Sequence, residues 1–272
     1  MKERVRISIT LRPEIVNLLD NNIDGTKIRN RSHAVEHFLR ESLATPVGQA
    51  VILIEDENKS LTTVCGETVI DKMLYQLDKA SINKIIVCCT KKCKKIQKHL
   101  KKKKYNKFQF TFTENPLKGT AAALMNCKQH LSPETFLLIY GDVIAELDVY
   151  DLGDFHKASN GIATMVVTSI SDPLPWGVVR VKRDRILEFH EKPTSKPSAK
   201  KRLTNIINAG IYAFQPEIFS YMNKRSKSLE KEVIPKLINQ KALYSYLLDG
   251  AWFNISHEHL LKHAKTYCRP KK

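Results

Sequence analysis

The sequence lacks long apolar runs. None approaches the roughly 18–20 residues that a membrane-spanning helix needs. The N-terminal stretch MKERVRISIT alternates charged and β-branched side chains, whereas a signal peptide has a continuous apolar region. We therefore expect a cytoplasmic protein with no membrane partner.

Cysteine is sparse and irregularly spaced. Six cysteines occur in 272 residues, and none forms the C-x-x-C spacing of zinc or redox sites. A chain of this length buries a sizeable core without disulfides. The expected state is therefore reduced, mostly buried thiols.

Acidic residues are outnumbered, with 28 Asp and Glu against 45 Lys and Arg and a formal net charge of +17. This balance favours a polyanionic partner, with nucleic acid as the leading candidate. Residues 91–107 contain ten lysines and no acid. Two interpretations of this run stay open, a solvated helix face and a contact with DNA phosphates.

The first 45 residues have the pattern of a small separate unit. Residues 4–11 alternate apolar and polar side chains, which predicts a strand with one dry face. Pro13 suits the first turn of a helix that ends near Gly25, and Ser32 is a good N-cap for a second helix. So small a unit buries too little apolar surface to stand alone, so it is expected to pair with a second copy.

This strand-helix-helix order resembles the ribbon-helix-helix family of DNA-binding proteins over residues 3–44. The resemblance implies a homodimer or higher homo-oligomer whose paired strands enter the major groove of double-stranded DNA. The implied DNA-contacting residues are Arg4, Arg6, Ser8 and Thr10 on the strand, and Arg31, Ser32 and His33 at the start of the second helix. A dimerisation arm without DNA is the alternative.

A boundary is expected at residues 44–48, where Pro46 and Gly48 break the helical pattern. The domains are then 1–45 and 49–268. Beyond it, strand-like runs alternate with helical stretches, which predicts an α/β domain. The strand-like runs are residues 50–54, 84–89, 108–113, 136–140, 162–168 and 177–181, and the helical stretches lie near 67–80, 91–104, 119–131 and 151–158.

A series of short motifs follows in a fixed order. They are Gly119-Thr-Ala-Ala-Ala-Leu124, Tyr140-Gly-Asp142, Trp176-Gly-Val-Val179, Glu191-Lys-Pro193, Asn208-Ala-Gly-Ile-Tyr212, Glu232-Val-Ile-Pro235 and Gly250-Ala-Trp-Phe-Asn-Ile255. The series resembles the sugar-1-phosphate nucleotidyltransferases. The resemblance implies a Rossmann-like, GT-A-like fold with a mixed, mostly parallel sheet.

The resemblance also implies one ligand pocket for a nucleotide, sugar phosphate or nucleotide sugar. Gly119 would border the base and Asp142 would hold Mg²⁺, while Gly177, Glu191, Lys192 and Asn208 would line the sugar-phosphate side. If the domain is active, Asp142 and Lys192 are the candidate catalytic residues.

The sequence departs from the family pattern at two places. Residues 54–66 lack the family's glycines and arginine and carry three consecutive acids, 55–57, where a triphosphate would lie. Asn254 replaces a second metal-binding carboxylate, which leaves it a weak ligand beside Asp142. Lys59 and Lys72 are the candidates to replace the missing positive charge.

These departures favour a pseudoenzyme. The resulting hypothesis is a DNA-binding transcription regulator whose inactive nucleotidyltransferase-like domain senses its ligand. Two alternatives stay open. One is an active sugar-1-phosphate nucleotidyltransferase with a DNA-binding or dimerising arm, and the other is an architectural DNA-binding scaffold.

Overall fold

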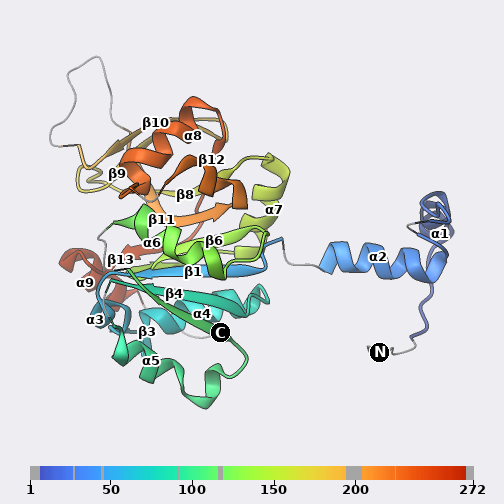
Figure 1. Cartoon of the computed structure of the whole chain (residues 1–272), viewed down its shortest axis with the longest axis horizontal. Coiled ribbons are helices and arrows are strands. Elements are labelled where there is room, and N and C mark those ends of the chain that lie inside the picture. The colour runs from blue at the N-terminus through green and yellow to red at the C-terminus, as the bar shows by residue number, and fades with distance from the viewer. Residues whose placement is uncertain are drawn as a thin grey trace. The chain divides into compact units, whose positions relative to one another are not determined.

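The computed structural model describes residues 7–26, 28–43, 46–90, 92–115, 119–193, 204–223 and 225–267 (Figure 1). The internal contacts divide the chain into two compact units, Met1–Ala44 and Thr45–Lys272. Each unit is described by itself.

The N-terminal unit contains two helices, α1 (Pro13–Asn21) and α2 (Arg31–Leu43). Leu19, Ile28 and Ala34 form a small buried cluster between them. The guanidinium of Arg31 donates to the carboxylate of Asp20 at 2.6 Å, which ties the start of α2 to α1. The core is small because so short a unit can bury only a few apolar side chains.

The N-terminal unit differs from expectation in two respects. In this single chain residues 7–12, which include Ser8 and Thr10, form no strand, and Ile7 and Ile9 are 67% and 53% exposed, while pairing with a second copy stays a prediction. A strand is stabilised by a hydrogen-bonded neighbour, and the described part of this single chain offers residues 7–12 none. Arg4 and Arg6 lie outside the described residues.

The second difference, at the start of α2, shows that the expected cap was wrong. Asn30, and not Ser32, caps this helix, because Oδ1 of Asn30 accepts the backbone N–H of His33 at 2.9 Å. Arg31, Ser32 and His33 thus form the first turn of the helix, as residues inside it. The first of them is engaged with Asp20.

The larger unit is built on a nine-stranded sheet of order β5-β4-β1-β6-β11-β8-β12-β10-β9. Its strands are β1 (Gln49–Ile54), β4 (Lys84–Cys89), β5 (Gln109–Glu114), β6 (Phe136–Tyr140), β8 (Ala163–Ser169), β9 (Gly177–Lys182), β10 (Arg185–Glu191), β11 (Ile206–Phe214) and β12 (Leu243–Leu247). Two small sheets pair β2 (Thr63–Val64) with β3 (Glu67–Thr68) and β7 (Val143–Ala145) with β13 (Trp252–Asn254).

Helices cover both faces of the sheet. The helices of this unit are α3 (Glu57–Ser60), α4 (Val69–Lys79), α5 (Lys94–Leu100), α6 (Thr120–Cys127), α7 (Val149–Ser159), α8 (Ile234–Asn239) and α9 (Glu258–Thr266), with short η segments at Lys103–Tyr105, Lys128–His130, Pro216–Tyr221 and Leu229–Val233. Figure 1 shows α4 beside β4.

Alternation along the strands produces two cores. Ala50, Ile52 and Ile54 of β1 point to the core beneath α4, α5, α7 and α9, whereas Val51 and Leu53 point to the core beneath α6 and α8. Because both faces are covered, the central strands are apolar throughout, which is why their sequence reads as continuous apolar runs.

The expectation of a mostly parallel sheet holds for only one half. Strands β5, β4, β1 and β6 are parallel to their neighbours. Beyond β6, the pairs β6–β11, β11–β8, β12–β10 and β10–β9 are antiparallel, and only β8–β12 is parallel. The sheet is therefore mixed. Among the antiparallel pairs, β9 and β10 are consecutive in the chain and joined without an intervening helix.

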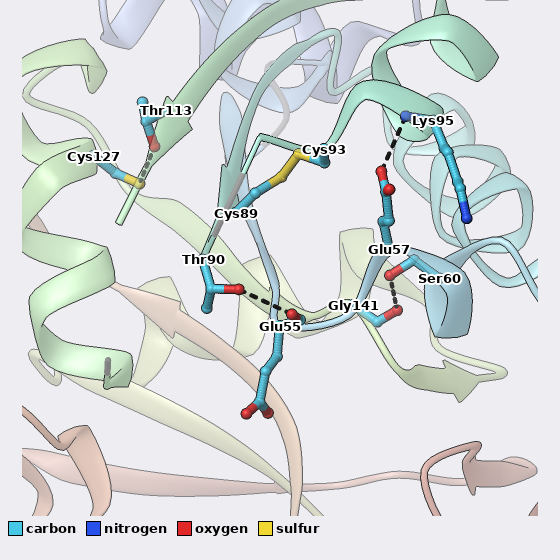
Figure 2. Close-up of a disulfide and its surroundings, with 10 residues drawn as sticks. All are labelled: Glu55, Glu57, Ser60, Cys89, Thr90, Cys93, Lys95, Thr113, Cys127 and Gly141. Carbon is cyan, nitrogen blue, oxygen red and sulfur yellow. Dashed lines mark hydrogen bonds between the residues drawn. A yellow bond between two sulfur atoms is a disulfide. The ribbon is translucent and has the colours of Figure 1, made fainter. Parts of the chain in front are cut away.

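The cysteines also differ from expectation. Cys89 and Cys93 form a disulfide, with their Cα atoms 6.2 Å apart (Figure 2). Cys65 is disulfide-bonded as well, while Cys88 and Cys127 are free and buried. The reason is local, because the turn from the end of β4 into α5 brings Cys93 back within disulfide range of Cys89.

The lysine-rich run forms α5 and the turn after it. Ile96 and Leu100 are buried against the core, and Lys98 is exposed between them. Lys104 and Lys107 pair with carboxylates of α4 at 3.3 and 2.5 Å. In this described portion, the run is a helix with a solvated basic face and a thin buried stripe. None of the described helices has the length and apolar character that a bilayer crossing requires.

Candidate active site

A pocket of about 750 Å³ opens at the carboxyl ends of β1, β4 and β6. Ligands of α/β sheets commonly bind at this edge. The seven residues that the sequence assigned to ligand or metal all line this pocket. They are Gly119, Asp142, Gly177, Glu191, Lys192, Asn208 and Asn254. The fold thus gathers residues from elements far apart in the chain.

Asp142 and Asn254 are brought together by the small sheet of β7 and β13. Asn254 pairs with Val143, the residue after Asp142. The hydroxyl of Ser256 donates to Oδ2 of Asp142 at 2.5 Å, and the backbone N–H of Ser256 donates to Oδ1 of Asn254 at 2.8 Å. Ser256 therefore bonds both to a carboxylate oxygen of Asp142 and to the amide oxygen of Asn254.

These oxygens suit a hard cation such as Mg²⁺, which prefers oxygen ligands and commonly takes one or two carboxylates together with substrate phosphates. Within the described ranges, no three or more His, Cys, Asp or Glu side chains gather into a set that would hold a metal. A cation at Asp142 would thus depend on oxygens of the ligand as well.

Glu191 is the last residue of β10 and Lys192 follows it, and both line the pocket. Glu191 pairs with Gly177 of β9, and the backbone N–H of Lys192 donates to the carbonyl of Trp176 at 3.0 Å. Burial raises the pKa of Glu191, and the nearby charge of Glu230 raises it further. The site therefore holds two interacting carboxylates beside an exposed lysine.

Glu230 was missed by the sequence reasoning. Tyr140 donates its hydroxyl proton to Oε1 of Glu230, while Thr120 and Ser228 donate to Oε2 at 2.8 Å each. Burial and the charge of Glu230 raise the pKa of Tyr140 well above its usual value. The only sequence signal was its place two residues before the motif that begins at Glu232.

Gly119 precedes α6 with a backbone that only glycine adopts readily. Its φ is +130°, and a Cβ there would lie 2.2 Å from the carbonyl oxygen of Lys227. The same carbonyl accepts the backbone N–H of Ala121 at 3.0 Å. Gly119 is therefore needed where the pocket wall passes close to a second segment.

Asn208 holds the irregular part of β11, where the pairing with β8 shifts register. Its side chain donates to the hydroxyl of Tyr212 at 2.5 Å and accepts the backbone N–H of Gly210 at 2.9 Å. The indole N–H of Trp252 donates to the carbonyl of Ala209 at 2.9 Å. These bonds fix the backbone of β11 at the pocket wall.

His257 also lines the pocket. Its ring centroid lies 4.2 Å from that of Trp176. Burial lowers the pKa of His257, and the positive charges of His259 and Lys192 lower it further. The sequence spacing does not predict this contact, because it forms only when β13 pairs with β7.

The acidic loop is less repulsive than its sequence suggests. Glu57 accepts the backbone N–H of Lys95 at 3.0 Å, away from the pocket, and Asp56 caps α3 by accepting the N–H of Asn58 at 2.9 Å. Figure 2 shows Glu57 directed to Lys95, whereas the side chain of Glu55 points away from Lys95. Glu57 is turned away from the pocket, whereas Glu55 and Asp56 still line it, so the acidic segment brings two carboxylates to the site and not three.

Comparison with known proteins points to the same family as the motifs that line the pocket. Residues 53–268 match the model of the family described as "Nucleotidyl transferase". The chain is 31% identical over 205 residues to mannose-1-phosphate guanyltransferase 2 of Candida glabrata, covering 72% of this chain and 55% of that protein. It is 35% identical over 163 residues to probable mannose-1-phosphate guanylyltransferase 3 of Arabidopsis thaliana, covering 58% and 47%.

The chain thus spans about half the length of the curated relatives it matches. Among solved structures, the fold is similar to that of a putative glucose-1-phosphate thymidylyltransferase from Bacillus anthracis. The TM-score is 0.70 at 20% identity, covering 82% of this chain and 97% of that one.

These relatives overturn the preferred hypothesis from the sequence. Proteins that match the larger unit carry the names of sugar-1-phosphate nucleotidyltransferases. The interpretation as a DNA-binding transcription regulator with an inactive sensor domain is therefore wrong, because it gave two departures, at residues 54–66 and at Asn254, more weight than the rest of the motif series. The match over residues 53–268 shows that the chain belongs to the nucleotidyl transferase family.

Proposed function

We propose that the chain is an active sugar-1-phosphate nucleotidyltransferase, with mannose 1-phosphate and GTP as the first substrates to test. The supporting observation is the gathering of Gly119, Asp142, Glu191, Lys192 and Asn208 around one pocket. Its volume of about 750 Å³ lies within the usual range for ligand pockets. The names of the relatives suggest the sugar and the nucleotide.

The reaction requires the sugar phosphate to attack the α-phosphorus of the triphosphate. A new phosphorus–oxygen bond forms as the bond between the α- and β-phosphates breaks, and pyrophosphate leaves with the electron pair. The ammonium of Lys192 neutralises phosphate charge, while Glu191 and Asn208 orient the sugar. A divalent cation held by Asp142 and Asn254 would add charge stabilisation when bound.

The test is pyrophosphate release from purified protein with Mg²⁺, using each nucleoside triphosphate against a panel of sugar 1-phosphates. We expect turnover that depends on both substrates and falls at least 100-fold in Asp142→Ala and Lys192→Gln. Lys98→Gln is the matched control, because this exposed lysine lies on α5 outside the pocket. Absence of turnover with every pair of substrates would refute the proposal.

For residues 1–45 we propose a self-association unit. The support is a set of exposed apolar side chains, with Ile7, Ile9, Ile15 and Leu18 at 67%, 53%, 44% and 59% exposure. A second copy of the chain would cover them. Light scattering of the full chain should report a dimer, and Leu18→Asp should shift it to monomer. A wild-type chain that stays monomeric at micromolar concentration would refute this assignment.

A further inference from the structure

Lys59 is a pocket cation without an acidic partner. It is half-buried on α3, and its ammonium donates to the hydroxyl of Ser256 at 3.0 Å. Among the described residues, no carboxylate lies within ion-pair distance of it. Lys72, the other candidate from the sequence, pairs with Glu67 at 3.4 Å. The structure thus separates the two candidates, because only Lys59 lines the pocket.

The bond to Ser256 places Lys59 beside the metal-binding carboxylate. Lys59 donates to the Ser256 oxygen, and the single hydroxyl proton of Ser256 is donated onward to Oδ2 of Asp142 at 2.5 Å. The order of donors and acceptors is consistent along this chain of bonds. An anion bound next to Asp142 would therefore lie within reach of the Lys59 ammonium.

Helix α3 is held on two sides, which fixes where Lys59 can reach. On one side, Glu57 accepts the backbone N–H of Lys95, and Nζ of Lys95 donates to Asn58 at 2.7 Å. On the other, the hydroxyl of Ser60 donates to the carbonyl of Gly141 at 2.7 Å (Figure 2). Because neighbours on both sides of Lys59 are anchored, its ammonium is presented to the pocket with little freedom of the backbone.

The charge balance indicates what Lys59 binds. The described lining contains Glu55, Asp56, Asp142, Glu191 and Glu230 but only two lysines, 59 and 192. A triphosphate carries several negative charges, and it needs cations at more than one point in such a site. Lys192 directly follows Glu191 after the end of β10. Lys59 stands on α3, which follows the acidic residues at 55–57, where the family resemblance places the triphosphate.

We infer that Lys59 is the phosphate-binding residue that holds the nucleotide's phosphate chain in this pocket. The inference rests on the proposed function for its substrate. Its contact with phosphate is a property of the site that can be measured without turnover.

The kinetic test compares Lys59→Gln, Lys59→Arg and the control Lys98→Gln. Lys59→Gln should raise the KM for the nucleoside triphosphate about 10- to 100-fold and leave the KM for the sugar 1-phosphate within twofold. Lys59→Arg should recover most of the loss, because it keeps the charge. An unchanged nucleotide KM, or a rise confined to the sugar phosphate, would overturn the inference.

A binding test separates this inference from the proposed function. Calorimetry with Mg²⁺ and inorganic pyrophosphate should show binding to the wild type and to Lys98→Gln, and a loss of at least tenfold in Lys59→Gln. If the wild type binds pyrophosphate through Lys59 but turns over no substrate, the proposed function fails and the inference stands. Equal binding by the wild type and Lys59→Gln, or no binding by either, overturns it. Thermal unfolding of each variant verifies that the fold is intact.

Discussion

Thr120 donates a hydrogen bond of 2.8 Å to Glu230, a residue 110 positions further along the chain. The same threonine oxygen accepts the backbone N–H of Leu229 at 2.9 Å. This pair joins the first turn of α6 to the η segment at Leu229–Val233, and so closes one wall of the pocket. Glu230 is thereby fixed close enough to Glu191 to influence its protonation.

Replacing Glu230 with glutamine should lower the pKa of Glu191. Burial and the Glu230 charge both raise this pKa above its ordinary value, and the substitution removes the charge while keeping the shape. If activity requires ionised Glu191, the acidic limb of the pH profile of kcat/KM moves to lower pH in the variant. An acidic limb that stays in place would exclude electrostatic coupling between these two carboxylates.

Replacing Asn254 with aspartate should reduce the Mg²⁺ concentration needed for half-maximal activity. The added carboxylate lies across Ser256 from Asp142 and supplies the charge that the amide lacks. We expect a decrease of about tenfold, since one added ionic contact is worth roughly 1.5–3 kcal/mol at best. The measurement is a Mg²⁺ titration at saturating substrates. An increase in the required Mg²⁺ would contradict the assignment of Asn254 to the metal site.

His156 should make stability depend on pH. The buried ring bonds to Oγ1 of Thr164 at 2.8 Å, and burial lowers its pKa to about 4. Between the unfolded value near 6.5 and about 4, only the unfolded state takes up this proton, so the free energy of unfolding falls as pH decreases through that range. The full effect is about 3 kcal/mol.

The measurement is urea unfolding at pH 7 and pH 4.5, in the wild type and in His156→Gln. The variant is expected to lose less stability than the wild type over this interval. The comparison also removes the contribution of Asp71, whose pKa is lowered by hydrogen bonds from His99 and Tyr105 although burial opposes it. Equal losses in both proteins would contradict the role given to His156.

The disulfide between Cys89 and Cys93 predicts a specific alkylation pattern. In protein unfolded without reductant, Cys88 and Cys127 should react and the disulfide pair should not. Mass spectrometry of the peptides resolves the two classes. Cys93→Ser is expected to cost about 2 kcal/mol of unfolding free energy, a small value because the closed loop is short. Free thiols at both positions in the air-oxidised protein would contradict this pairing.

Much of the larger unit can be predicted from the sequence. The run FLLIY predicts a buried strand over 136–140, and β6 has these bounds. The helix expected near 151–158 is α7, at 149–159. Such apolar patterns are good predictors because the burial of a strand on both faces of a sheet requires apolar side chains throughout. The candidate pocket residues came instead from the resemblance of the motif series to the sugar-1-phosphate nucleotidyltransferases.

The parts that could not be predicted depend on distant partners. The alternating pattern of residues 4–11 favours a strand, but the neighbour expected for it is a second copy, which a single chain does not supply. The acids at 55–57 suggest repulsion, yet Glu57 is engaged by Lys95 of α5, 38 positions away. Glu230 has no local pattern of its own. In each case the deciding contact is made only after the chain has folded.

The most direct test of the central claim follows the phosphorus atoms themselves. Purified chain is mixed with GTP, mannose 1-phosphate and Mg²⁺, and the mixture is followed by phosphorus NMR, with Asp142→Ala as the parallel sample. The account predicts that the wild type forms a sugar nucleotide and pyrophosphate in equal amounts, and that the variant forms neither at a comparable rate. Unchanged substrates in the wild-type sample, repeated for every nucleotide and sugar 1-phosphate pair, would contradict it.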